Sequence, residues 1–84
     1  MKWTVTYTPS ARDELAIIWM DATDRNAVST AAEALEAQLK SDPLRVGESR
    51  GGKRRLVIEP PLAIDYEADY NDMLVIVIRI LKWN

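Results

Sequence analysis

The sequence predicts an α+β fold of two layers, in which a helical hairpin covers one face of an antiparallel β-sheet. Three observations predict this class. Apolar and polar residues alternate near the start of the chain and again in its second half. Between these stretches, two consecutive segments place apolar residues at helical spacing. Short turns alone separate the last strands. All 84 residues are expected to form a single domain, 1–84.

The first half of the chain is expected to contain one strand and two helices. Residues 2–7, "KWTVTY", alternate between apolar and polar side chains as a half-buried strand does. A helix is predicted over Pro9–Asp21, with Thr8 or Ser10 as its N-cap. A second helix is predicted over Arg25–Ser41. The short connection between them predicts an antiparallel helical hairpin.

The second half of the chain is expected to supply the rest of the sheet. Residues 44–52 read as a loop with room for a short strand at Val46–Ser49. Strands are predicted over residues 53–59, 62–69 and 73–83. The last run is nearly continuously apolar, which is typical of a central strand. We therefore expect the element order β-α-α-β-β-β and the sheet order 1-4-3-2, antiparallel throughout.

The composition excludes several kinds of site. The chain has no cysteine and no histidine, so disulfides, thiolate metal sites and histidine-based catalysis cannot occur within it. The carboxylates of residues 65–72 read as a solvated acidic turn, and we predict neither a metal nor a cofactor. The longest apolar run is far shorter than the roughly 20 residues that a membrane helix needs. With no apparent signal peptide, the expected location is the cytoplasm, without membrane contact.

Positive charge is concentrated in one short segment of a chain whose net charge is −2. Five of the 11 cations lie between residues 45 and 55, beside a single acid, Glu48. One interpretation is a patch that binds nucleic acid through its phosphates. The other is a solvated loop and strand edge whose charges prevent aggregation. The candidate residues are Arg45, Arg50, Lys53, Arg54 and Arg55.

Strand alternation divides these cations between the two faces of the sheet. If Leu56 and Ile58 face the helices, Arg54 lies on the core side, and Lys53 and Arg55 point together to the open face. Two cations there could hold phosphates or stabilise charge during phosphoryl transfer.

Two further residues attract attention because of their surroundings. Arg79 interrupts the apolar run "IVIRIL". We assign the alternating isoleucines of this run to the core, which places Arg79 on the open face with Lys53 and Arg55. A salt bridge from Arg79 to Asp65 or Glu67 is the alternative. Tyr66 lies on a predicted strand, where a tyrosine is usually part of the core.

Taken together, these features resemble the RelE/ParE toxin superfamily of bacterial type II toxin–antitoxin modules. The similar segments are "YTPSARDELAIIWM", "DPLRVGESRGGKRR" and "LAIDYEADYNDMLVIVIRILKW", which together span most of the chain. The resemblance implies a toxin, as in plasmid stabilisation modules, with a cognate antitoxin as its partner. RelE-like members cleave messenger RNA on the ribosome, whereas ParE-like members inhibit DNA gyrase.

The resemblance also assigns roles to individual residues. Lys53 and Arg55 match the basic residues of the strand that follows the loop, and Tyr66 matches the family's strand tyrosine. In a metal-independent endoribonuclease, Lys53 and Arg55 would stabilise the phosphate and Arg79 would assist. Lys82 is the nearest match to a basic residue near the C-terminus.

Other expected family residues are missing. The arginine of the "R-x-x-Y" strand falls at Ala63, and no tyrosine follows the last strand. A gyrase inhibitor that acts by protein binding therefore stays open, as does a non-toxic binding domain with this fold. A homodimer is a further expectation for so small a domain.

Overall fold

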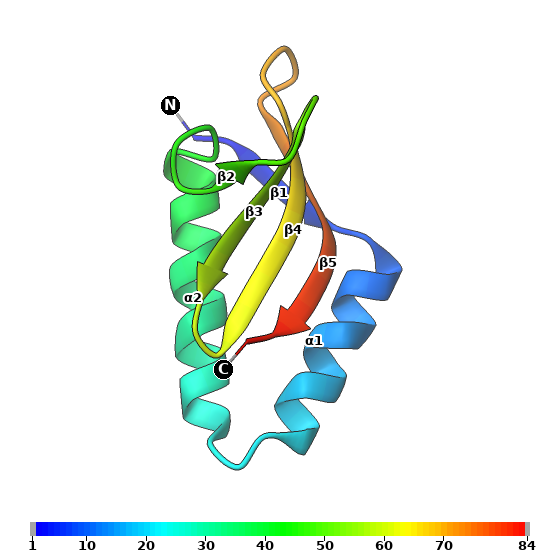
Figure 1. Ribbon diagram of the computed structural model, residues 1–84, viewed down its shortest axis with the longest axis vertical. Helices are drawn as coiled ribbons and strands as arrows, with labels where there is room; N and C mark the ends of the chain where they lie inside the picture. The colour runs from blue at the N-terminus through cyan, green and yellow to red at the C-terminus, as the bar shows by residue number, and fades with distance from the viewer. Residues whose placement is uncertain (1, 84) are drawn as a thin grey trace.

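The computed structural model describes residues 2–83 as a curved five-stranded sheet with two helices packed on it (Figure 1). The helices pack their buried side chains against the same face of the sheet. In chain order the elements are β1 (Thr4–Tyr7), α1 (Pro9–Asp21), α2 (Arg25–Ser41), β2 (Glu48–Ser49), β3 (Arg54–Glu59), β4 (Leu62–Asp69) and β5 (Leu74–Lys82).

Both helices begin and end at the residues expected from the sequence. The Thr8 hydroxyl accepts a hydrogen bond from the Ala11 N–H at 3.1 Å and caps α1. The Asp24 carboxylate does the same for the Ala27 N–H at 3.0 Å and caps α2. Each cap satisfies a main-chain donor that the first helical turn would leave unpaired.

The sheet order is β1-β5-β4-β3-β2, which is close to the prediction but differs in two ways. β2, two residues long, adds an edge strand next to β3. The expectation of a wholly antiparallel sheet is wrong, because β1 and β5 are parallel. The physical reason is visible in Figure 1: the chain passes from β1 into α1 without turning back, then reverses at each of the four later connections between helices and long strands. An even number of reversals leaves β5 pointing the same way as β1.

The core lies between the helices and one face of the sheet, but the strands present different residues to it than expected. Val57 of β3 and Val75 and Val77 of β5 are buried there, opposite Ile64, Ala68 and Tyr66 of β4. Leu56 and Ile58 instead lie on the open face. The expected phase was wrong in both strands, because each has apolar residues on both faces and alternation alone cannot choose between them.

A β-bulge in β5 explains why Arg79 nevertheless lies on the open face. Tyr66 pairs with Val77 and the preceding residue, Asp65, pairs with Arg79, so Ile78 is an extra residue on β5. The extra residue inverts the alternation, as a bulge does. Beyond it Ile80 is buried in the core, as predicted, and Arg79 is exposed.

The outer edge of β5 is covered by β1 along its first half and by α1 along its second. β1 ends at Tyr7, opposite Val77. Past that point the Thr8 hydroxyl donates to the Ile78 carbonyl at 3.1 Å. One Glu14 carboxylate oxygen then accepts the Ile80 N–H at 2.9 Å, and the other accepts Arg79 Nη2 at 2.9 Å. Side chains of the first helix thus replace the missing strand.

Removing the Glu14 carboxylate should weaken this junction. Glu14→Ala leaves the Ile80 N–H without its acceptor, and we expect a loss of about 1 kcal/mol in the free energy of unfolding. Urea denaturation at neutral pH measures it. Asp13→Ala, one residue away on the exposed side of α1, is the matched control and should change little.

The same junction predicts an acid dependence of stability. The bond from Ile80 and the charge of Arg79 lower the pKa of Glu14 in the folded protein, against a smaller opposing effect of burial. A lowered folded pKa stabilises the protein above the ordinary carboxyl pKa, and this contribution disappears as the pH falls through the folded value. Glu14→Gln should therefore lose less stability than the wild type between pH 7 and acid. An equal loss in both proteins would contradict the assignment.

Candidate functional site

Two side chains on the helix-facing side of the sheet anchor the basic segment between α2 and β3. The buried Tyr66 hydroxyl donates to the Pro43 carbonyl at 2.6 Å. Arg55 Nη2 donates to the Gly47 carbonyl, and Arg55 Nε is buried without a partner among the described residues. Both residues come from paired positions of β3 and β4. The loop that carries Arg45 is therefore bound to the sheet at Pro43 and at Gly47.

Gly47 and Tyr66 fit together closely. A Cβ atom at position 47 would lie 2.6 Å from the Tyr66 hydroxyl and 2.9 Å from the Leu56 carbonyl oxygen, so only glycine fits there. Burial raises the pKa of Tyr66, and the nearby charge of Arg55 opposes this effect. Tyr66 thus stays a neutral hydrogen-bond donor inside the protein.

The turn before β3 depends on its two glycines. Gly51 and Gly52 have φ angles of 100° and 56°, in the left-handed region that other residues rarely adopt. The turn brings Lys53 to the end of the sheet, where Lys53 Nζ lies 3.2 Å from a carboxylate oxygen of Asp69. This contact, together with N–H donors of residues 71 and 72, lowers the pKa of Asp69.

Arg54 lies on the open face of the sheet, not on the core side as predicted. Its guanidinium makes a two-pronged contact with Asp65, one strand away, with Nε at 3.2 Å from Oδ1. The hydrogen bonds and the charge of Asp65 raise the pKa of Arg54. In such a bidentate pair, two N–H groups of the planar guanidinium bind the two carboxylate oxygens.

The other predicted cations are distributed around the molecule. Arg45 lies 3.8 Å from Asp42 in the loop, and Arg79 binds Glu14 of α1 rather than Asp65 or Glu67, the partners of the alternative interpretation. Among residues 2–83, Arg50 and Lys82 form no salt bridge. Arg50 lies with Arg54, Leu56, Asp65 and Leu81 around a shallow depression of about 350 Å³ on the open face.

The three residues expected to form a catalytic group do not lie together. Lys53 contacts Asp69 at the end of the sheet, Arg55 points to the helix-facing side, and Arg79 contacts α1. The expectation that Lys53 and Arg55 share the open face is wrong, because Val57 rather than Leu56 faces the core and this reverses the strand's phase. Within the described residues, no three acids lie close enough to hold a metal ion.

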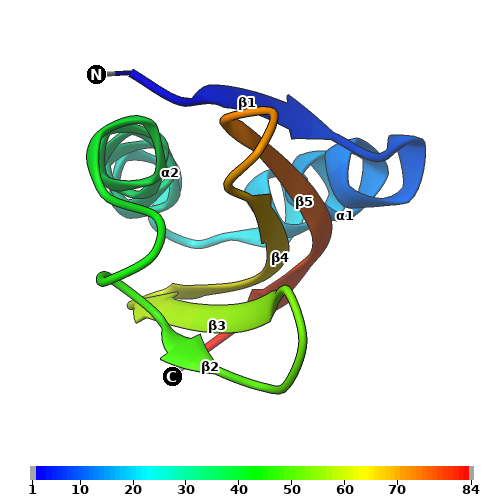
Figure 2. The same cartoon turned by 90° about the horizontal axis from the view of Figure 1, so that it is seen from above.

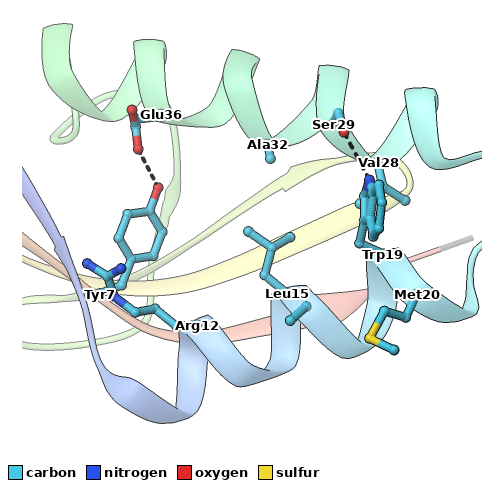
Figure 3. Close-up of a pocket in the computed structure, with 10 residues that line it drawn as sticks. Tyr7, Arg12, Leu15, Trp19, Met20, Val28, Ser29, Ala32 and Glu36 are labelled. Atoms are coloured by element: carbon cyan, nitrogen blue, oxygen red, sulfur yellow. Dashed lines mark hydrogen bonds between the residues drawn. The ribbon is translucent and has the colours of Figure 1, made fainter.

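A larger hollow lies between the two helices. It has a volume of about 630 Å³, and its walls are mainly apolar (Figure 3). Its lining is made of Tyr7, Arg12, Leu15, Ala16, Trp19, Met20, Val28, Ser29, Ala32 and Glu36. We call this hollow the interhelical groove.

Two hydrogen bonds close the interhelical groove at its ends, as Figure 3 shows. The Tyr7 hydroxyl donates to Glu36 at 2.7 Å, and Trp19 Nε1 donates to the Ser29 hydroxyl at 3.2 Å. Burial and the neighbouring carboxylate raise the pKa of Tyr7, while the hydroxyl's hydrogen bond lowers that of Glu36. The guanidinium of Arg12 lies 5.7 Å from the centre of the Tyr7 ring. The groove is thus apolar in the middle and polar at the rim.

The interhelical groove was not among the sites predicted from the sequence. The signal was present in "AIIWM", residues 16–20, because five consecutive apolar residues cannot all face one side of a helix. Ile17 and Met20 are 58% and 65% exposed, and Trp19 is 41% exposed. An apolar surface of this kind on a small protein often marks a protein interface.

The fold is shared with several solved structures. The toxin–antitoxin complex RelBE2 from Mycobacterium tuberculosis contains a chain that is 20% identical, with a TM-score of 0.80 over 98% of this chain and 99% of that one. A chain of the chromosomal ParDE TA system from P. aeruginosa is 15% identical, with a TM-score of 0.75 over 99% and 98%. The isolated E. coli RelE toxin is 15% identical, with a TM-score of 0.70 over 98% and 85%.

At these identities the likeness establishes the fold, which is that of the RelE and ParE toxin structures. No protein-family model matches the sequence, and no curated protein is detectably similar to it. Neither α1 nor α2 combines the length and the apolar character that a membrane-crossing helix needs.

The anchoring role of Tyr66 can be tested by removing a single atom, its hydroxyl oxygen. Tyr66→Phe leaves the Pro43 carbonyl without its donor, and we expect a loss of about 1–2 kcal/mol in the free energy of unfolding. Amide exchange at residues 44–50 should accelerate by more than the global loss explains. Tyr70→Phe is the matched control, because Tyr70 is 67% exposed. Equal effects of the two substitutions would contradict the anchor.

Proposed function

We propose that this protein is the toxin of a type II toxin–antitoxin pair and that it acts in the cytoplasm by binding a protein target. The toxin role is supported by one observation above all, the match of nearly the whole chain to toxin structures at TM-scores of 0.70–0.80. The match covers 98–99% of this chain and therefore includes both helices and the sheet.

Action by binding, rather than by cutting RNA, is supported by the positions of the cations. Lys53, Arg55 and Arg79 each have a different partner, and these partners come from different parts of the fold. Metal-independent RNA cleavage needs charged groups that converge on one phosphate and its leaving group. The family arginine that would fall at position 63 is also replaced by a buried alanine.

The interhelical groove is the surface best suited to a protein partner. Exposed Met20 borders its apolar middle, and its rim carries Arg12, which has no carboxylate partner among residues 2–83. Helical segments bind such grooves through apolar side chains spaced three and four residues apart. We propose that the antitoxin covers this groove with an amphipathic segment.

Growth on induction separates the proposed action from RNA cleavage. We expect growth arrest with intact messages, and the same arrest from Lys53→Ala/Arg79→Ala, since neither side chain is buried. Sequencing of RNA ends from induced cells measures cleavage. Messages cut in the wild type and intact in the double variant would instead establish an endoribonuclease.

Two further readings of the same cells test the target and the toxin role. Altered plasmid supercoiling during arrest would identify DNA gyrase as the protein target. No arrest, together with no small partner gene beside this one, would favour a non-toxic binding domain and would overturn the proposal.

The groove assignment predicts a separation of toxicity from neutralisation. Met20→Glu places a charge at the exposed rim, so co-purification with the product of the neighbouring gene should fall while growth arrest remains. Ala37→Glu, an exposed position on α2 that does not line the groove, is the matched control. Equal co-purification of both variants would place the partner elsewhere.

A further inference from the structure

The two edges of the sheet are protected unequally. At one edge β2 is only two residues long and carries a charge, both of which discourage pairing with another strand. At the other edge β1 has the sequence Thr-Val-Thr-Tyr, without charge, proline or bulge. Figure 2 shows β1 at the margin of the molecule, with no other element beyond it. The outer edge of β1 is therefore open to another strand.

The main-chain groups available at this edge can be identified. The Thr4 N–H binds the Met73 carbonyl at 2.9 Å and the Thr8 N–H binds the Val77 carbonyl at 3.0 Å, so even-numbered residues face β5. Peptide groups alternate along a strand, and those of Val5 and Tyr7 therefore face outward. No hydrogen bond to either group occurs among residues 2–83.

The open edge is limited at both ends. Before it, the Trp3 N–H donates to the Lys40 carbonyl at the end of α2, at 2.8 Å. After it, Pro9 has no N–H to donate. The edge thus offers two donors and two acceptors, those of Val5 and Tyr7, and any strand that pairs with it must match this short span.

We propose that β1 pairs antiparallel with β1 of a second copy of this chain. Val5 lies opposite Tyr7 of the partner subunit, and the two-fold axis passes beside Thr6. In this register each Val5–Tyr7 pair exchanges two hydrogen bonds, so all four donors and acceptors of each edge are satisfied. The two sheets join into one continuous sheet across the dimer.

Other registers leave groups unpaired. Moving the partner by two residues one way sets Tyr7 opposite Trp3, whose N–H is already bonded to Lys40. Moving it the other way sets Val5 opposite Pro9, which lacks a donor. A shift by one residue presents the even-numbered residues, which are already bonded to β5. The edge therefore matches a second copy of itself in a single register.

The side chains around the axis are compatible with a second copy. Thr4 and Thr6 are exposed and uncharged, so no like charges face each other. Val5 and Tyr7 are half-buried on the helix side, and pairing would cover more of their apolar surface. A domain of this size buries a limited core alone and gains stability from association.

Charges placed at position 6 test the proposal. In the predicted dimer the two Thr6 side chains face each other, so Thr6→Lys sets two cations opposite each other and should raise the dimer dissociation constant roughly fivefold or more. Thr6→Glu should do the same with anions. An equal mixture of the two variants should regain the wild-type dimer, because opposite charges then face each other. Sedimentation equilibrium of the purified chain over a range of concentrations measures this.

Three controls keep the result specific. Ser49→Lys adds the same charge to the opposite edge of the sheet and should leave the dimer intact. A cooperative thermal unfolding transition of the position 6 variants at low concentration shows that they still fold, although both lose the hydrogen bond that the Thr6 hydroxyl donates to the Val75 carbonyl at 3.2 Å. High salt should reduce the difference between Thr6→Lys and the wild type.

The dissociation constant of the purified chain tests the interface without any measurement of toxicity. A wild type that stays monomeric at all concentrations overturns the proposal, as does a dimer that both charged variants leave intact. Failure of the mixture to regain the dimer also overturns it. If the wild type is monomeric but Thr6→Lys weakens its complex with the neighbouring gene's product, the edge binds a different strand and a second copy is excluded.

Discussion

The fold depends on the need of β5 for hydrogen-bond partners along both of its edges. This strand buries one face in the core, and β4 pairs with its whole length on one side. On the other side β1 reaches only as far as Val77. Thr8 then supplies a donor and Glu14 an acceptor that a longer strand would have given. Unpaired main-chain groups beside a core are costly, so these two side chains fix where α1 can lie.

The position of α1 has further effects. α1 lies along the second half of β5, whereas α2 packs on β1, β3 and β4. The interhelical groove remains between the two helices because they pack on different strands. Because the residues after β1 turn directly into α1, β1 stays short and has no neighbour on its outer side. The groove and the open edge thus have the same origin.

Local signals in the sequence predicted the elements well. The N-cap and the proline at the start of α1, together with the helical spacing of both segments, gave both helices their observed limits. The four long strands followed from alternation and turn residues, with errors of one or two residues at some ends. These features depend on neighbours in the chain, which is why they can be predicted without knowledge of the packing.

The direction of β1 and the phase of β3 and β5 could not be predicted in the same way. Three consecutive apolar residues in β3 and a longer run in β5 allow either face to be buried, and the choice is made by pairing with β4. The extra residue Ile78 leaves no local mark in an apolar run. The groups expected to form the site depended on these phases, so Arg54 and Arg55 were each placed on the wrong face.

The salt bridges on the open face and at its end also affect how this protein can evolve. Asp69 and Asp65 lie beside the positive charges of Lys53 and Arg54 and neutralise them at short range. A change of either aspartate to asparagine keeps the size of the side chain and needs one nucleotide substitution in its codon. Each such change would expose a cation on a surface that already carries Arg50. The positive potential of this surface thus depends on Asp65 and Asp69 as much as on the cations themselves.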